Sequence, residues 1–200
     1  MASPTNLVIR KGSTFSRILR WESGPVVYKP ITGIPKAAPT VVTCVDHDIP
    51  EGWRVAIVSV VGMRQINAQN DPPRSRDYFK AKVLTADTVQ FDGINSAGFS
   101  AYKSGGYLRY NTPVPLTGYT ARMSVKDRVG GTELLRLDTT AGGIVIDATG
   151  FKITLDVSAA DTAALDWTYG VFDLEMVSST GVVKTLLSGT VTVQPEVTTD

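Results

Sequence analysis

Hydrophobic and polar residues alternate along two stretches of the chain in the way that is typical of half-buried β-strands. In residues 113–126, PVPLTGYTARMSVK, every second residue from Tyr119 to Val125 is apolar, and the residues between them are polar or charged. Residues 169–177, YGVFDLEMV, repeat the alternation, with Asp173 and Glu175 on the polar face. Period-two alternation predicts a strand that rests one face on a core. We expect these two strands to be partners in one β-sandwich.

The start of the chain predicts further strands of the same sandwich. Residues 7–10 and 15–21 are apolar-rich and are separated by the turn sequence Lys-Gly-Ser. Residues 22–25, ESGP, predict a second turn. We therefore expect an early hairpin within one sheet, followed by an interruption.

The interruption begins with residues 29–39, KPITGIPKAAP, whose three prolines each deny a sheet one hydrogen-bond donor. We interpret this segment as a linker. Five short strand candidates follow, at residues 41–45, 54–61, 78–84, 88–91 and 107–110. Short strands without a helix predict a small β-barrel or roll. The sequence thus predicts a discontinuous sandwich from residues 1–30 and 113–200, with residues 31–112 inserted as a small β domain.

The C-terminal part contains further strand candidates and one helix candidate. The strands are predicted at residues 134–137, 144–147, 151–157, 182–187 and 189–197. Residues 158–165, SAADTAAL, predict a short helix, because Ser158 can cap its start, Asp161 lies in its first turn and alanine favours helix. The predicted fold class is all-β with this one short helix.

Composition narrows the classes of partner. Of 200 residues, 42% are hydrophobic and 20% are charged, and the net charge of +1 gives no basic footprint for nucleic acid. No apolar run approaches the roughly 20 residues of a membrane-spanning helix, and the first residues lack the apolar region of a signal peptide. The single cysteine, Cys44, permits no internal disulfide and suits a reducing cytosol.

The only histidine, His47, lies between two carboxylates in the sequence Val-Asp-His-Asp. It is a candidate base, or a candidate metal ligand together with Asp46 and Asp48. No second histidine or ligand spacing accompanies it, so the sequence favours a solvated turn. Cys44 is a candidate nucleophile beside His47, but a small buried apolar residue is the favoured interpretation.

Other candidate sites also have simpler explanations. Asp173 and Glu175 share one strand face, as glycosidase carboxylates can, but charged residues are mostly solvated. The glycine-rich stretches Ser104-Gly105-Gly106 and Gly142-Gly143 fit no phosphate-loop pattern. We therefore expect no enzyme, no cofactor and no metal.

Two groups of residues are candidates for binding rather than catalysis. A mild basic cluster near the start of the chain consists of Arg10, Lys11, Arg17 and Arg20. It is either ordinary surface charge or a contact for acidic neighbours in an assembly. Three tyrosines of the middle segment are candidates for stacking on sugars: Tyr102, Tyr107 and Tyr110. In a β domain such rings more often fill the core or anchor an interface.

The last predicted strand is a candidate interface. Its first residues, GTVTV, carry no charge, and natural proteins usually protect an edge strand with charge, proline or cover. If this strand lies at an edge, another chain should cover it. The predicted interface residues are Gly189, Thr190, Val191, Thr192 and Val193. We expect the contact to extend toward Val197, cover by a neighbour to hold the end at Asp200, and each copy to bury more than about 1,000 Å² in total.

Two modules of tailed bacteriophages resemble parts of this chain. The segments LVIRKGSTFSRILRW, PVPLTGYTARMSVKD, GGIVID, FKITLDVSAADTAALDW, YGVFDLEMV and LLSGTVTVQPEVT are similar to the N-terminal immunoglobulin-like domain of phage upper-baseplate proteins. The middle, from PEGWRVAIVSVVGMRQIN to VQFDGINSAGFSAYKSGG, resembles a phage module named after the first catalytic-cysteine half-domain of ubiquitin-activating enzymes. That borrowed name implies no enzymatic chemistry, because Cys44 lies in no thioester-forming pattern.

The resemblance implies an immunoglobulin-like sandwich and a structural role in a virion. The expected function is that of a non-enzymatic subunit of the tail, baseplate or collar, made in the bacterial host cytoplasm and docked to other virion proteins and to copies of itself. One alternative is a capsid decoration protein. Another is a carbohydrate-binding module of the adsorption apparatus, with a host surface glycan as partner. Nucleic acid and membrane are not expected as partners. Fold alone does not decide among these roles.

Overall fold

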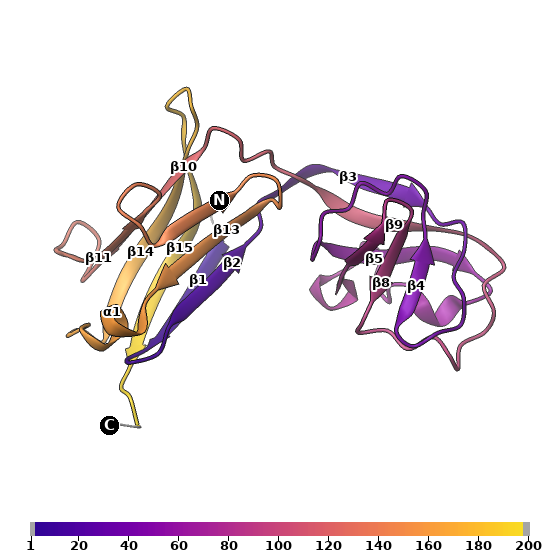
Figure 1. Ribbon diagram of the computed structural model, residues 1–200, viewed down its shortest axis with the longest axis horizontal. Helices are drawn as coiled ribbons and strands as arrows, with labels where there is room; N and C mark the ends of the chain where they lie inside the picture. Colours follow the sequence, from indigo (N-terminus) through magenta and orange to yellow (C-terminus); the bar gives the residue numbers. More distant parts are fainter. Residues whose placement is uncertain (1–2, 198–200) are drawn as a thin grey trace. The chain divides into compact units, whose positions relative to one another are not determined.

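The computed structural model describes residues 3–197 and consists mostly of β-strands (Figure 1). The chain divides into two compact units, one formed by Met1–Trp21 and Val114–Asp200, the other by Glu22–Pro113. We call them the sandwich unit and the inserted unit. The predicted all-β fold class is confirmed. The predicted tail contact at Asp200 lies outside the described residues.

The sandwich unit contains two sheets that enclose one core. The five-stranded sheet has the order β1 (Ser3–Arg10), β15 (Val183–Gln194), β14 (Tyr169–Val177), β10 (Thr120–Lys126) and β11 (Glu133–Asp138). The three-stranded sheet has the order β12 (Ile144–Asp147), β13 (Lys152–Val157) and β2 (Phe15–Leu19). As predicted, the two alternating stretches are direct partners, with Met123 opposite Leu174 in the antiparallel β10–β14 pair. Their apolar faces are buried in the core.

The expected hairpin at the start of the chain does not form. β1 pairs in parallel with β15, and β2 pairs antiparallel with β13, so the two strands belong to different sheets. The turn between them lets the chain cross from one sheet to the other. Leu7 and Ile9 then reach the core from one side, and Phe15 and Leu19 pack against it from the other. Because the chain crosses between the sheets, the apolar faces of β1 and β2 are buried in one core from opposite sides.

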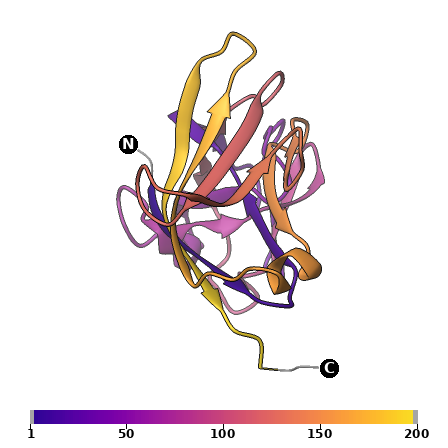
Figure 2. The same cartoon turned by 90° about the vertical axis from the view of Figure 1, so that its left-hand side faces the viewer.

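The last strand does not lie at an edge, so the condition on which its interface was expected is not met. β15 lies between β14 and β1, and residues 189–193 pair with Thr5–Ile9 on one side and with β14 on the other. Figure 2 shows the long hairpin that β15, in yellow, forms with β14. The sequence lacks charge there because Val191 and Val193 are buried in the core, and β1 covers the edge that needed protection.

The short helix forms where the sequence predicts it. α1 (Ala159–Ala163) begins after Ser158, whose Oγ accepts a hydrogen bond from the Asp161 N–H at 3.1 Å. The Thr162 hydroxyl donates to the carbonyl oxygen of Ser13 at 2.9 Å. This bond ties the helix to the turn between β1 and β2.

The inserted unit contains two small sheets. One has the order β3 (Glu22–Pro30), β9 (Ser104–Pro113), β5 (Arg54–Val61) and β6 (Phe79–Lys80). The other has the order β4 (Thr40–Thr43), β8 (Thr88–Phe91) and β7 (Lys82–Thr85). Two 3-10 helices that the sequence analysis missed, η1 (Arg64–Ile66) and η2 (Ser75–Asp77), lie between β5 and β6.

The predicted boundary after residue 30 is displaced, because residues 22–30 belong to the inserted unit. The expected turn at residues 22–25 is the start of β3, which pairs with β9. β3 is an edge strand, so Pro25 and Pro30 remove no donor that a neighbour needs. The expected linker also packs, since Ile31 and Ile34 are both buried. Prolines therefore mark an edge of this sheet rather than a linker.

The contact between Gly189 and β1 generates the first prediction. Gly189 has a φ of +153°, and a Cβ at this position would overlap the Thr5 carbonyl oxygen. We expect Gly189→Ala to reduce the free energy of unfolding by about 1–3 kcal/mol, because β1 must shift to admit the methyl group. Urea unfolding measures the loss, and hydrogen–deuterium exchange should show it in the β1 amides.

Ser188→Ala is the matched control for this prediction. Ser188 lies one residue earlier on β15, already has a Cβ, and its hydroxyl has no hydrogen-bond partner among residues 3–197. Equal stability of the two variants would contradict a close β1–β15 contact at Gly189.

Candidate functional site

Cys44 and His47 are buried in the inserted unit, and backbone groups engage both ring nitrogens of His47. The His47 ring is 2% exposed, its Nδ1 accepts from the Ile49 N–H at 3.0 Å, and its Nε2 lies 2.9 Å from the Thr85 carbonyl oxygen. These contacts require the neutral tautomer with the proton on Nε2. The expected solvated turn is therefore wrong in one respect, since His47 is buried and braces the loop before β5.

The thiol of Cys44 is also buried, as the sequence favoured. Burial raises the pKa of the thiol to about 11, with a smaller opposing effect from Lys29. A thiol with such a pKa is almost entirely protonated near neutral pH and is a poor nucleophile. Together with the occupied nitrogens of His47, this argues against a nucleophile–base pair.

The two aspartates beside His47 contact a lysine instead of a metal. Lys29 Nζ lies 2.5 Å from Asp48 Oδ2 and donates to the Asp46 carbonyl oxygen at 2.6 Å. Among residues 3–197, no group of three or more histidine, cysteine, aspartate or glutamate residues has an arrangement that could hold a metal ion.

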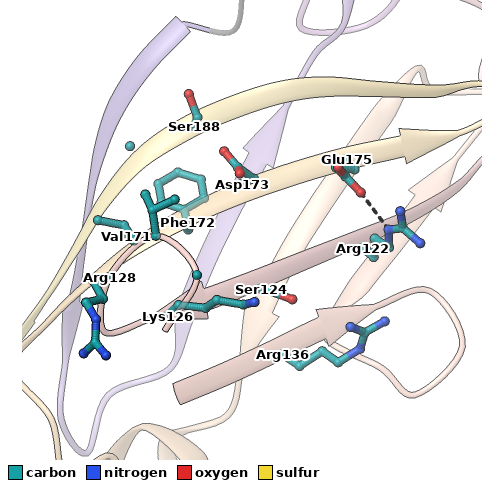
Figure 3. A pocket seen from close by; sticks show the side chains of 13 residues that line it. Arg122, Ser124, Lys126, Arg128, Arg136, Val171, Phe172, Asp173, Glu175 and Ser188 are labelled. Atoms are coloured by element: carbon teal, nitrogen blue, oxygen red, sulfur yellow. Dashed lines mark hydrogen bonds and ion pairs between the residues drawn. The ribbon is translucent and has the colours of Figure 1, made fainter. Parts of the chain in front are cut away.

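Asp173 and Glu175 lie on the outer face of the five-stranded sheet, where the sequence favoured a solvated position. They line a hollow of about 560 Å³ that the turn between β10 and β11 borders (Figure 3). Arg122 Nε donates to Glu175 Oε2 at 2.7 Å. Asp173 is exposed and has no hydrogen bond or ion pair within the described part of the chain. Glu175 thus forms an ion pair, whereas a glycosidase needs a carboxylic acid that can donate a proton to the leaving group.

The same hollow includes part of the predicted interface. Ser188 and Gly189 form one of its walls, and Arg128, Arg136 and Lys126 bring further positive charge to it (Figure 3). β1 covers the edge of β15, and Val191 and Val193 are buried in the core, so these two residues of the predicted interface 189–193 are not on the surface. The intersubunit contact of this strand stays a prediction, because the structure contains a single chain.

The basic cluster predicted near the start of the chain is only partly brought together. Arg10 and Arg17 line a second hollow, of about 460 Å³, along β1 and β2. We call this hollow the edge groove. Arg20 points elsewhere, donating to the carbonyl oxygens of Gly150 and Phe151.

The three candidate tyrosines have three different environments. Tyr110 is 2% exposed and donates to the His47 carbonyl oxygen at 2.8 Å. Tyr102 donates to the carbonyl oxygens of Ile31 and Gly105, both at 3.0 Å. These two rings support the fold. Tyr107 is 43% exposed on the outer face of β9 and remains a candidate for ligand contact.

Tyr107 belongs to a larger surface on the sheet β3-β9-β5-β6, which we call the Tyr–Arg surface. Its members are Tyr28, Arg54, Tyr78, Tyr107 and Arg109. The register explains it, because Tyr28 lies opposite Arg109 in the β3–β9 pair and Tyr107 precedes Arg109 by two residues. All three therefore point to one face.

Arg109 lies at the centre of the Tyr–Arg surface. Its Cζ is 5.8 Å from the ring centroid of Tyr28 and 5.9 Å from that of Tyr78, and the guanidinium donates to both phenol oxygens. No carboxylate pairs with it in the described part of the chain. Arg109 is thus a positioned cation that has no negative counterpart.

Arg54 differs from Arg109 because it is neutralised. Its Nε and Nη2 donate to the two carboxylate oxygens of Glu22, both at 2.6 Å, and these bonds raise the pKa of Arg54. Asn111 Nδ2 also donates to Glu22 at 2.8 Å. This network holds Arg54 5.1 Å from the Tyr78 ring centroid.

Sequence reasoning identified only Tyr107 of this surface. Tyr28 was missed because the prolines on either side of it were interpreted as a turn and a linker. Tyr78 was missed because it follows a 3-10 helix that was not predicted. One signal was present: in residues 107–111, YLRYN, alternate positions carry Tyr, Arg and Asn while Leu108 and Tyr110 are buried. In a strand with this alternation, Tyr107, Arg109 and Asn111 lie on the face opposite the two buried residues, which is the solvent face.

No protein-family model matches the chain, and no curated protein matches it. Within residues 3–197, no helix is both long and apolar enough to span a membrane. The functional argument therefore rests on the residues themselves.

The buried thiol generates the second prediction. In the native protein at pH 8, iodoacetamide should modify Cys44 much more slowly than in the urea-unfolded chain, because the folded pKa of about 11 leaves little thiolate. The raised pKa also means that the protonated thiol stabilises the fold below about pH 9, the usual value, and that this contribution disappears as the pH rises toward 11. Mass spectrometry of the alkylated protein measures the rate. Equal rates in the native and unfolded states would contradict the buried position.

Proposed function

We propose that this protein is a non-enzymatic structural subunit of a tailed-phage virion, in the tail, baseplate or collar, that docks to and bridges neighbouring virion proteins. The resemblance of both parts of the sequence to phage modules supports this role. The observation that carries it is the pair of unpaired strand edges, β1 and β2, which border the edge groove of the sandwich unit.

These edges are protected only in places, by Pro4 and Arg10 on β1 and by Arg17 on β2. Within residues 3–197, β1 pairs only with β15 and β2 only with β13, so the outer edge of each strand has backbone groups without strand partners. Natural proteins usually protect such edges with charge, proline or cover. Arg17 is the only charge on β2, while Ile18 is 58% exposed and Val8 on β1 is 46% exposed. A neighbouring chain that adds a strand satisfies the backbone and covers these side chains.

The inserted unit supports a bridging role. Its ends meet, because Glu22 lies opposite Pro113 in the β3–β9 pair. An insertion whose ends are close together adds little closure cost to the domain that hosts it. One chain therefore offers two separate bodies for contact, each with its own core.

The non-enzymatic part of the proposal rests on the surroundings of the candidate catalytic residues. The catalytic pair that the sequence offered, Cys44 and His47, has a protonated buried thiol and two ring nitrogens engaged by backbone groups. The paired carboxylates Asp173 and Glu175 lie on an open sheet face, where Glu175 is bound to Arg122.

Two alternative functions remain. A capsid decoration protein needs the same edge contacts and differs only in its place in the particle. A carbohydrate-binding module of the adsorption apparatus is favoured by a different observation, the exposed rings of Tyr28 and Tyr107 on the inserted unit.

The third prediction tests the strand edges. Purified protein should self-associate with increasing concentration in analytical ultracentrifugation, and Ile18→Lys should weaken association about tenfold or more, because a charge on an edge strand opposes strand addition. Val129→Lys is the matched control, since Val129 is 91% exposed at the β10–β11 turn and lies on no strand. A wild-type protein that stays monomeric, or an equal effect of both variants, would count against the edge contact.

The virion assignment has a separate test. Antibody to this chain should label one defined place on phage particles purified from cells that carry the gene, and the reading frames that flank the gene should encode tail or baseplate proteins. Labelling of the capsid would favour the decoration alternative. Particles that lack the chain altogether would reject the proposal.

A further inference from the structure

We propose that the Tyr–Arg surface of the inserted unit binds an acidic saccharide, that is, a pyranose that carries a carboxylate on its ring, as uronic and sialic acids do. This inference goes beyond the structural role and does not depend on it. It develops the carbohydrate-binding alternative by naming the site and the class of sugar.

The rings of Tyr28 and Tyr107 form a corner that fits one sugar ring. Their centroids are 6.1 Å apart and their planes meet at 86°, so the face of one ring lies beside the edge of the other. Tyr28 is 53% exposed and Tyr107 is 43% exposed. Aromatic rings with this exposure offer an apolar surface to the C–H face of a pyranose and a hydroxyl to its polar rim.

The charge of the surface favours an anion. Within residues 3–197 Arg109 has no carboxylate partner, and it lies 5.8 Å from the Tyr28 centroid, which is close enough for one ligand to touch both the ring and the guanidinium. Lys80 lies opposite Arg54 in the β5–β6 pair, is exposed, and forms no ion pair with the described residues, so it adds a second cation to this face. Glu22 neutralises only Arg54. A guanidinium recognises a carboxylate through two parallel hydrogen bonds, and Tyr28 and Tyr78 hold Arg109 in place for this contact.

The surface fits a sugar better than an acidic peptide. An extended peptide would bind by adding to the free edge of β3, where Pro25 and Pro30 lack the N–H groups that strand addition needs. The outer face instead presents the phenol groups of Tyr28 and Tyr78 beside Arg109. The Asn111 amide and the Glu22 carboxylate, bonded to each other, lie farther along β9 and β3. Such a mixture of donors and acceptors suits the hydroxyl groups of a saccharide. The sheet beneath holds these groups without a loop rearrangement.

Isothermal titration calorimetry with four probes tests the proposal. The intact protein should bind tetragalacturonate or an α2,8-linked sialic acid trimer, and should bind maltotetraose and hexaglutamate at least about tenfold more weakly. Binding should weaken as salt is added, because the contact to Arg109 is ionic. No binding to either acidic saccharide overturns the proposal. Equal binding of hexaglutamate overturns it in favour of an acidic protein partner, and equal binding of maltotetraose shows that the carboxylate is not recognised.

Variants locate the site. Arg109→Gln should weaken binding of the acidic saccharide by about tenfold or more, since a hydrogen-bonded charge is lost, and Tyr107→Ala should weaken it several-fold. Arg64→Gln and Tyr169→Ala are matched controls, because both residues are exposed and neither belongs to the Tyr–Arg surface. Tyr107 is a surface residue, so its variant keeps the test valid if Arg109→Gln fails to fold. Unchanged binding in Tyr107→Ala, or equal losses in the controls, would overturn the assignment.

The two functional proposals can fail separately. Arg109→Gln should leave self-association unchanged, and Ile18→Lys should leave saccharide binding unchanged. The first variant lies in the inserted unit and the second in the sandwich unit.

Discussion

The parallel pairing of β1 with β15 is the constraint on which the sandwich unit depends. It places the start of the chain beside its last strand, so that Leu7, Ile9, Val191 and Val193 enter one core. The pairing requires a glycine at residue 189, because the Thr5 carbonyl occupies the space of a side chain. It also places β15 inside its sheet and leaves β1 at the edge of that sheet.

Local patterns were sufficient for most strands and for the helix. Alternation identified β10 and β14, and a serine cap identified α1, because these signals depend on residues that are neighbours in sequence. Which strands pair with each other was harder to predict from the sequence. Residues 189–193 carry no charge whether they lie at an unprotected edge or between two strands, and only the long-range contact with β1 distinguishes the two cases. The same limit explains β1 and β2, whose short turn suggested a hairpin.

Prolines caused the larger error in the inserted unit. Pro25 and Pro30 deny donors to a sheet, which the sequence analysis interpreted as a turn and a linker, yet both lie on the edge strand β3, where no donor is needed. Tyr28 was lost with that strand. The Tyr–Arg surface was therefore harder to predict than the fold, since it combines Tyr28, Tyr78 and Arg109 from three distant segments. The alternation of residues 107–111 was the only local signal.

The inserted unit separates structural and functional demands by sheet face. On β9, Leu108 and Tyr110 point inward and are buried, while Tyr107 and Arg109 point outward. Substitution of the outward residues removes little packing, so the surface can change while the core stays intact. The core in turn engages the groups that otherwise carry chemistry: His47 braces a loop through both ring nitrogens, and burial raises the pKa of the Cys44 thiol to about 11. Reactive residue types thus support the fold inside, while cations and aromatic rings lie on the outer face.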